Sequence, residues 1–217
     1  MNKFKQEIFY DFVENFYHEN YLNKNKGALF LDRDGVIIKD VNYIKDPDDV
    51  QIEKGLIELL AKAYEFRWPV FVVTNQSGIS RGFYDWHDFY KVNQRMIELI
   101  GEPNPIYSIY ANSHKSLNFN NWRKPNPHMI NHAADRFNIN LSKSILIGDR
   151  ISDMLAGLNS GINNLIHVET GHGINERNQI SKYINKYGFF SYSGLTSRII
   201  LIDNLNSFPY KMLNQKI

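Results

Sequence analysis

Asp32 and Asp34 are placed for nucleophilic and acid–base chemistry. They lie two residues apart at the end of a short apolar run, so in an extended backbone their side chains point to the same side. One carboxylate can attack phosphorus and form an aspartyl-phosphate, which splits a difficult hydrolysis into two steps. The other can protonate the leaving alkoxide and then deprotonate the attacking water. We assign the nucleophile to Asp32 and the acid–base role to Asp34; the alternative is a pair that only forms a turn or a helix cap.

A metal ion is needed because two carboxylates that face a phosphate repel it. Asp149 follows another apolar run and can complete an all-oxygen site with Asp32 and a backbone carbonyl. Few, hard oxygen ligands suit magnesium, which keeps several waters and also binds phosphate. We therefore expect Mg²⁺ among Asp32, Asp34 and Asp149. Asp153, four residues after Asp149, is expected to act through water or to hold the geometry of the site. Both Asp149 and Asp153 could instead cap the following helix.

The transferring phosphoryl group also needs hydrogen-bond donors, since its catalysis rests on positioning and electrostatics. The Thr74 hydroxyl and the Asn75 backbone N–H, at the end of a second apolar run, can donate to the non-bridging oxygens. Lys124 supplies a compact positive charge. Gly35 and Gly78 would let the backbone turn tightly near the phosphate. Taken alone, Thr74 could simply end a strand and Lys124 could be a solvated loop charge.

These residues follow the strands of a predicted α/β fold. Short apolar runs with β-branched or aromatic residues predict strands at 28–31, 70–73, 106–110, 144–147, 165–168 and 199–202. Helical spacing of apolar residues predicts helices at 56–66, 85–99, 127–137 and 153–159. Their alternation indicates a doubly wound parallel sheet covered on both faces. Ligands in such sheets bind beyond the carboxyl ends of the strands, which is where the candidate residues fall.

Four motifs in this order resemble the phosphatases of the haloacid dehalogenase (HAD) superfamily, which show Asp-x-Asp, then Ser/Thr, then Lys, then a pair of acidic residues. More narrowly, Leu-Asp-Arg-Asp-Gly-Val at 31–36, Thr-Asn-Gln-Ser-Gly-Ile-Ser-Arg-Gly at 74–82 and Arg-Lys-Pro at 123–125 resemble the heptose-bisphosphate and histidinol-phosphate phosphatase branch. The resemblance spans residues 28 to about 173 and implies a HAD-like, Rossmann-type, essentially capless fold. It also implies that Arg81 and Arg123 contact the rest of the substrate.

The resemblance has one departure, at the loop before the Arg-Lys-Pro motif. Relatives in that branch commonly hold a zinc ion there, in a Cys-x-His…Cys-x-Cys pattern. This chain contains no cysteine, so residues 111–122 cannot form a tetrahedral thiolate site, and His114 alone is no replacement. We expect magnesium but no zinc.

The first 26 residues are expected to form an extension to a catalytic domain at 27–217. Apolar residues at positions 4, 8, 9, 12, 13, 16 and 17 form a stripe at helical spacing. We expect an amphipathic helix that folds back onto its own domain. A dimer contact or a docking helix for a partner protein is the alternative, so the expected state is a monomer or a homodimer through this helix.

Composition argues against other classes of protein. Hydrophobic residues make up 43% and charged residues 22% of the chain, as in ordinary globular proteins. The net charge is +2 without a long basic run, which argues against nucleic-acid binding. No stretch approaches the ~20 apolar residues that cross a membrane, and the first thirty residues lack the apolar core of a signal peptide. We therefore expect a cytoplasmic protein that does not bind membranes.

The sequence thus predicts a magnesium-dependent phosphatase that hydrolyses a small phosphorylated metabolite. A sugar phosphate or a related surface-polysaccharide precursor is the expected substrate, by analogy with the family. Two alternatives stay open. A phosphotransferase or mutase of the same superfamily would show acceptor-dependent turnover. A non-catalytic scaffold would bind a partner through the N-terminal helix, although the intact carboxylates argue against it.

Overall fold

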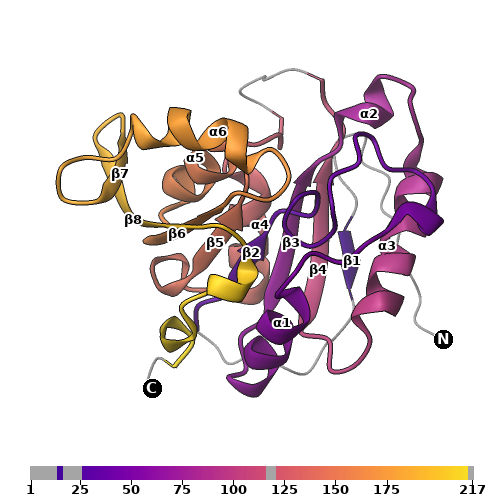
Figure 1. Cartoon of the computed structure of the whole chain (residues 1–217), viewed down its shortest axis with the longest axis horizontal. Coiled ribbons are helices and arrows are strands. Elements are labelled where there is room, and N and C mark those ends of the chain that lie inside the picture. Colours follow the sequence, from indigo (N-terminus) through magenta and orange to yellow (C-terminus); the bar gives the residue numbers. More distant parts are fainter. Residues whose placement is uncertain (1–13, 17–25, 116–120, 215–217) are drawn as a thin grey trace.

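A twisted eight-stranded sheet forms the centre of the computed structural model, which describes residues 14–16, 26–115 and 121–214. The strands lie in the order β1-β4-β3-β2-β5-β6-β8-β7 (Figure 1). Their bounds are β1 Glu14–Phe16, β2 Leu29–Leu31, β3 Val70–Asn75, β4 Ile106–Asn112, β5 Ile145–Gly148, β6 Asn164–Val168, β7 Phe189–Tyr192 and β8 Leu195–Ile202. The six inner strands are parallel, and the two edge strands pair antiparallel. The predicted doubly wound α/β fold is confirmed.

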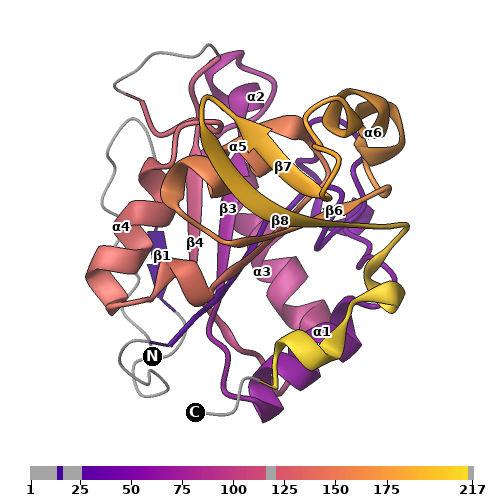
Figure 2. The ribbon, with the colours of Figure 1, turned by 90° about the vertical axis from the view of Figure 1, so that its left-hand side faces the viewer.

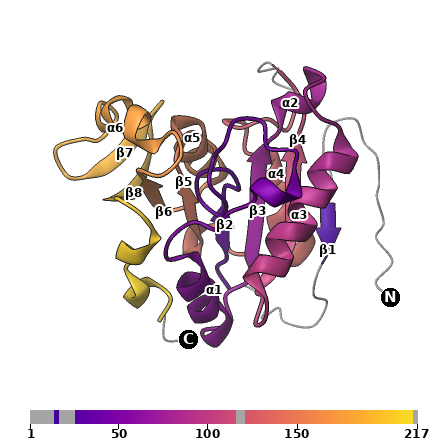
Figure 3. The same ribbon diagram turned by 45° about the vertical axis from the view of Figure 1, so that its right-hand side comes forward.

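Helices cover both faces of the sheet. In Figures 2 and 3, α1 (Leu56–Glu65) and α3 (Trp86–Ile100) lie on one face, and α4 (His128–Phe137) and α5 (Ile151–Ser160) lie on the other. The alternation of side chains along β2 explains why both faces are apolar: Leu29 and Leu31 pack in the core cluster beneath α1 and α3, and Phe30 packs in the cluster beneath α4 and α5. A strand buried on both sides therefore reads as a continuous apolar run.

Some elements lack the periodic signal that predicted the others. The short α2 (Ser77–Ser80) follows β3 directly, and α6 (Gly173–Ser181) buries only Gly173 and Ile180. Strand β7, at the sheet edge, buries only Phe190 of its four residues. Short 3-10 turns occur at Pro47–Asp49, Leu141–Lys143, Leu205–Ser207 and Tyr210–Met212. None of the helices in the described part of the chain is long and apolar enough to cross a membrane.

The N-terminal segment differs from its prediction where it is described. Residues 14–16 form β1, which pairs antiparallel with β4 and places Glu14 opposite Tyr110 (Figure 1). At these three residues the structure has a strand in place of the expected helix, because the chain adds an edge to the sheet. The rest of the expected helix lies outside the described residues, and the division of the chain at residue 27 stays a prediction.

The topology reverses direction beside β2. From β2 the chain adds β3 and β4 on one side, and β5, β6 and β8 on the other. A doubly wound sheet has its ligand crevice at such a point, outside the carboxyl ends of the strands. Residues 32–55, between β2 and α1, carry only one 3-10 turn and isolated bridges. This connection therefore forms no separate cap domain over the crevice.

Candidate active site

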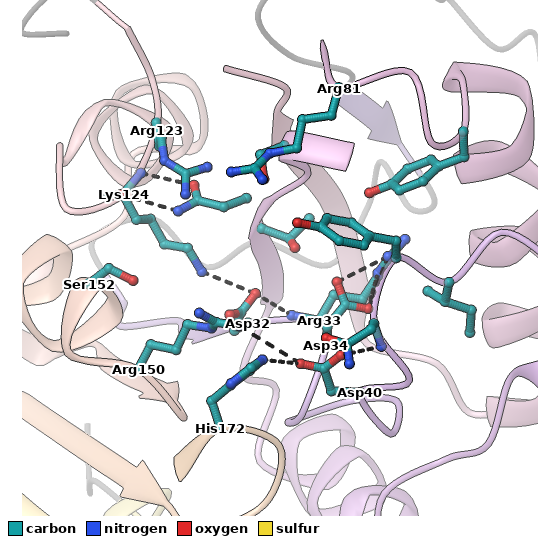
Figure 4. A pocket seen from close by; sticks show the side chains of 17 residues that line it. Asp32, Arg33, Asp34, Asp40, Arg81, Arg123, Lys124, Arg150, Ser152 and His172 are labelled. Atoms are coloured by element: carbon teal, nitrogen blue, oxygen red, sulfur yellow. Dashed lines mark hydrogen bonds and ion pairs between the residues drawn. The ribbon is translucent and has the colours of Figure 1, made fainter. Parts of the chain in front are cut away.

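A cleft of about 390 Å³ opens at the carboxyl ends of β2 and β3 (Figure 4). The residues that line it include seven of those chosen from the sequence: Asp32, Asp34, Thr74, Asn75, Arg81, Arg123 and Lys124. Asp149 follows β5, the neighbour of β2, and is fully buried beside the cleft. The fold thus brings together residues that are far apart in the sequence, because neighbouring parallel strands end at the same edge of the sheet.

Lys124 contacts both the nucleophile candidate Asp32 and the buried carboxylate of Asp153. Its side chain is only 2% exposed, and Nζ lies 3.0 Å from Asp32 Oδ1 and 2.6 Å from Asp153 Oδ1. Nζ also donates to the Val73 carbonyl at 2.7 Å. Burial opposes the charged form, but the negative charges of Asp153 and Asp32 raise the pKa of Lys124 above its ordinary value. A fully charged ammonium therefore lies against Asp32.

Asp32, Asp149 and Asp153 form a buried carboxylate cluster. One oxygen from each lies within 4.8 Å of the others. Asp149 Oδ2 accepts the His172 backbone N–H at 2.7 Å, while Asp149 Oδ1 has no hydrogen-bond partner among the described residues. Burial, followed by the charges of Asp153 and Asp32, raises the pKa of Asp149 to about 9. Buried carboxylates that repel one another, with an oxygen left over, fit a hard divalent cation such as Mg²⁺.

The nucleophile candidate shares this electrostatic environment. Burial is the largest cause that raises the pKa of Asp32 to about 6, opposed by Lys124 and assisted by Asp153 and Asp34. The backbone N–H of Arg33 and the Lys124 ammonium both lie against Asp32 Oδ1, at 2.7 and 3.0 Å. These two donors fix the orientation of the carboxylate at the floor of the cleft.

Asp153 and Asp34 take places that their spacing did not indicate. Asp153, expected to act through water or from behind the site, places its carboxylate within the buried cluster and also caps α5 by accepting the Arg150 N–H at 2.9 Å. Helix capping and site formation are thus combined in one side chain. The carboxylate of Asp34, in contrast, points toward Arg33 and Gln76 and is absent from the cluster of Asp32, Asp149 and Asp153. The roles of both residues stay predictions.

Asp34 is held by two side chains that the sequence did not single out for this role. Arg33 Nε donates to Asp34 Oδ1 and Arg33 Nη2 to Asp34 Oδ2, both at 3.1 Å. Gln76 Nε2 donates to Asp34 Oδ2 at 2.7 Å and to Thr74 Oγ1 at 2.8 Å. Both residues lie within the recognised motifs, but the residue types alone did not reveal their contacts.

The loop that carries Lys124 is fixed by Asn75. The Asn75 side chain accepts the Lys124 backbone N–H at 3.0 Å and donates to the Lys124 carbonyl at 3.1 Å. The predicted role of Asn75 concerned its backbone N–H, and the structure adds this structural role for the side chain. The end of β3 and the Lys124 loop are therefore locked together, which keeps Lys124 over Asp32.

Basic side chains surround the outer part of the cleft (Figure 4). Burial makes the largest contribution to lowering the pKa of Arg123, and the nearby charges of Arg150 and Arg81 lower it further. Arg123 also donates to the His114 carbonyl at 3.0 Å. Three guanidinium groups that repel one another in this way provide a site for an anion. Arg150 was missed from the sequence, although it directly follows Asp149 in the Gly-Asp-Arg motif.

One further ion pair lines the cleft. His172 Nε2 lies 2.8 Å from Asp40 Oδ2, and Arg150 Nη2 lies 3.9 Å from the same oxygen. Neither Asp40 nor His172 had a signal in the sequence, since one lies in a long connection and the other among scattered histidines. The close approach of their two loops depends on Gly35, whose φ is +83° and whose added Cβ would lie 2.9 Å from the Gly171 Cα.

Comparisons with known proteins agree with this geometry. Residues 121–187 match the HAD-hydrolase-like family. The D-glycero-beta-D-manno-heptose-1,7-bisphosphate 7-phosphatase of Helicobacter pylori is 40% identical over 151 residues, which cover 68% of this chain and 87% of the relative. The D-glycero-alpha-D-manno-heptose-1,7-bisphosphate 7-phosphatase of Campylobacter jejuni is 42% identical over 142 residues, which cover 65% of this chain and 81% of the relative.

Solved structures share the fold. A HAD-like protein from Mesorhizobium loti matches with a TM-score of 0.72 and 26% identity, over 96% of this chain and 92% of that chain. The D,D-heptose 1,7-bisphosphate phosphatase of B. bronchiseptica, crystallised with magnesium and phosphate, matches with a TM-score of 0.70 and 24% identity, over 88% and 99% of the two chains. Because it covers 87% of a relative that is 40% identical, this chain belongs to the heptose-1,7-bisphosphate 7-phosphatase family of HAD phosphatases.

Proposed function

We propose that this protein is a magnesium-dependent phosphatase that removes the 7-phosphate of a heptose 1,7-bisphosphate, by way of an aspartyl-phosphate on Asp32. The observation that carries the proposal is the position of Asp32 at the cleft floor, where it contacts the Lys124 ammonium and belongs to the buried cluster with Asp149 and Asp153. The names of the relatives supply the substrate. Such a reaction belongs to the synthesis of surface-polysaccharide precursors.

In the first step, a carboxylate oxygen of Asp32 attacks the phosphorus of the 7-phosphate. The new P–O bond forms as the bond from phosphorus to the C7 oxygen breaks, and Asp34 gives its proton to the departing oxygen. In the second step, Asp34 takes a proton from a water molecule, which attacks the aspartyl-phosphate. This releases inorganic phosphate and restores Asp32.

The remaining residues stabilise the charge that moves during these steps. Lys124 and the Thr74 hydroxyl line the cleft beside Asp32 and can donate to the phosphoryl oxygens. Asp32, Asp149 and Asp153 would hold Mg²⁺, together with a backbone carbonyl as the sequence suggests. When bound, the ion supplies electrostatic stabilisation of the phosphoryl group and offsets the repulsion among the carboxylates.

A second phosphate on the substrate explains the basic outer cleft. Arg81, Arg123 and Arg150 gather there, and their mutual repulsion is relieved when an anion binds among them. A monophosphate in the catalytic position would leave these charges uncompensated. The proposal therefore favours a bisphosphate over a simple sugar phosphate.

The test is phosphate release in the presence of Mg²⁺ from both anomers of heptose 1,7-bisphosphate, compared with heptose 7-phosphate, fructose 1,6-bisphosphate and histidinol phosphate. We expect a heptose bisphosphate to give the highest kcat/KM, and excess EDTA to abolish turnover. Asp32→Asn should lower kcat by at least ~10³-fold. Equal turnover by Asp32→Asn would refute the nucleophile, and preference for an added sugar acceptor over water would favour the transferase.

A further inference from the structure

We propose that Arg33 is a positioning residue that holds the Asp34 carboxylate in the orientation needed for proton transfer to the leaving group. This inference rests on the proposed function. Arg33 makes a two-pronged contact with its own neighbour in the chain, through Nε to Asp34 Oδ1 and Nη2 to Asp34 Oδ2, both at 3.1 Å (Figure 4). A planar guanidinium that binds both oxygens fixes the rotation of the carboxylate as well as its place.

Arg33 is itself held rigidly. Its side chain is 1% exposed, and Nη1 donates to Asn93 Oδ1 on α3 at 3.0 Å. The guanidinium carbon lies 4.9 Å from the centre of the Phe89 ring, also on α3. The contacts of Arg33 with α3 therefore fix the orientation of the Asp34 carboxylate.

Gln76 completes the arrangement on the other side. Its side-chain oxygen accepts from Arg33 Nη2 at 3.1 Å and from the Tyr84 hydroxyl at 2.5 Å. Its amide nitrogen donates to both Asp34 and Thr74. One network therefore links the acid–base carboxylate to the hydroxyl that faces the phosphoryl group.

Asp34 keeps the freedom that its role requires. Its side chain is 24% exposed at the cleft, whereas the side chain of Arg33, which also borders the cleft, is only 1% exposed. Each carboxylate oxygen can accept more than one hydrogen bond, so the contacts with Arg33 and Gln76 leave capacity on the side of the substrate. A buried guanidinium is a poor device for stability, because desolvation opposes the attraction. We therefore explain the position of the Arg33 guanidinium beside Asp34 by the need to orient the Asp34 carboxylate.

The proton transfer itself suggests a selective test. As the P–O bond breaks, its electron pair moves to the leaving oxygen, and the proton of Asp34 moves to that oxygen. A sugar alkoxide is a poor leaving group and needs this proton, whereas p-nitrophenolate leaves readily without it. Loss of the orientation of Asp34 should therefore damage alkyl esters much more than p-nitrophenyl phosphate.

The experiment compares kcat/KM for a heptose bisphosphate and for p-nitrophenyl phosphate in Arg33→Gln and Arg33→Lys. Because kcat/KM reports on steps up to leaving-group departure, we expect Arg33→Gln to lower it by about 10- to 100-fold for the sugar ester and by less than about threefold for p-nitrophenyl phosphate. Arg33→Lys, which keeps the charge but not the two-pronged contact, should show the same selectivity and serves where Arg33→Gln fails to fold. Arg95→Gln, an exposed arginine on α3, is the matched control.

A double variant separates positioning from structural damage. In an Asp34→Asn background, Arg33→Gln should lower kcat/KM for the sugar ester little further, because Arg33 acts through Asp34. Equal losses for both esters, or losses that multiply in the double variant, would overturn the role of Arg33. A wild-type protein that hydrolyses neither ester would instead refute the proposed phosphatase function.

Discussion

The metal-free protein should be stabilised by Asp149→Asn, although this change removes a proposed magnesium ligand. Asp149 is 0% exposed, and its Oδ1 has no hydrogen-bond partner among the described residues. An asparagine amide would still accept from the His172 N–H and could donate to the neighbouring carboxylates. The substitution therefore removes the cost of holding a proton on a buried carboxyl group and keeps a donor toward the neighbouring carboxylates.

The sign and size of the effect follow from the pKa of Asp149, which rises from 3.8 in the unfolded chain to about 9 in the folded protein. Between these values the folded state keeps a proton that the unfolded state releases, so stability falls as pH rises and levels off above pH 9. At pH 7 the difference from 3.8 is about 3 pH units, which gives a cost of at most about 4 kcal/mol at 1.36 kcal/mol per unit. At pH 5 this cost is smaller by about 3 kcal/mol, because the pH lies two units closer to the unfolded-state pKa of Asp149.

The assay is urea unfolding in EDTA at pH 7 and pH 5, followed by tryptophan fluorescence. We expect Asp149→Asn to raise the free energy of unfolding at pH 7, and the gap from wild type to narrow at pH 5. Asp203→Asn, on the exposed surface, is the matched control. Added Mg²⁺ should stabilise the wild type more than the variant, by mass action. A variant that is no more stable at pH 7, or a gap that does not change with pH, would refute the reasoning.

Three other substitutions test separate parts of the site. Lys124→Met should lower kcat by about 10²–10³-fold, as for loss of a charge-stabilising donor, in the phosphate-release assay; an unchanged kcat would contradict its contact with Asp32. Gly35→Ala should lower the free energy of unfolding by about 1–3 kcal/mol because of its φ of +83°, and further because the added Cβ clashes with Asp149. Gly188→Ala, with a similar φ and open space around it, should show only the backbone cost in urea unfolding. Burial lowers the pKa of His167 to about 4, so its contribution to stability is complete above pH 6.5 and is lost as the pH falls toward 4. Over this range the free energy of unfolding of His167→Gln should therefore fall by about 3 kcal/mol less than that of the wild type. Equal decreases in the two proteins would show that His167 does not cause this pH dependence.

The positions of the strands were predictable because the sheet is buried on both faces. Each of the six inner strands reads as a short apolar run, and the polar residues after the runs mark the edge where the strands end. The pairing of β2 with β3 and β5 then places Asp32, Thr74 and Asp149 together without further information. The edge strand β7 and the weakly buried helix α6 carry no comparable signal, since few of their side chains enter the core.

Side-chain directions at the site could not be predicted from spacing. Asp32 and Asp34 were expected to point to one side, as in a continuing strand. The strand ends at Leu31, however, and the chain then turns, with the Arg33 carbonyl accepting the Ile37 and Ile38 N–H groups. Asp32 therefore faces Lys124 while Asp34 faces Arg33. Spacing rules hold only as long as the backbone keeps one conformation. For the same reason, two adjacent residues that would lie on opposite faces of a strand can meet here in one ion pair.

The turn after β2 also explains how one loop can supply two carboxylates with opposite demands. Asp32 belongs to a buried cluster in which repulsion is balanced by Lys124 and suits a bound cation. In the proposed mechanism Asp34 accepts and releases a proton, which requires separation from that cluster and contact with the cleft. Because the strand ends at Leu31 and Asp34 pairs with Arg33, the two carboxylates lie two residues apart in sequence but in different electrostatic surroundings. Replacement of Arg33 should therefore affect proton transfer while leaving the carboxylates around Lys124 in place.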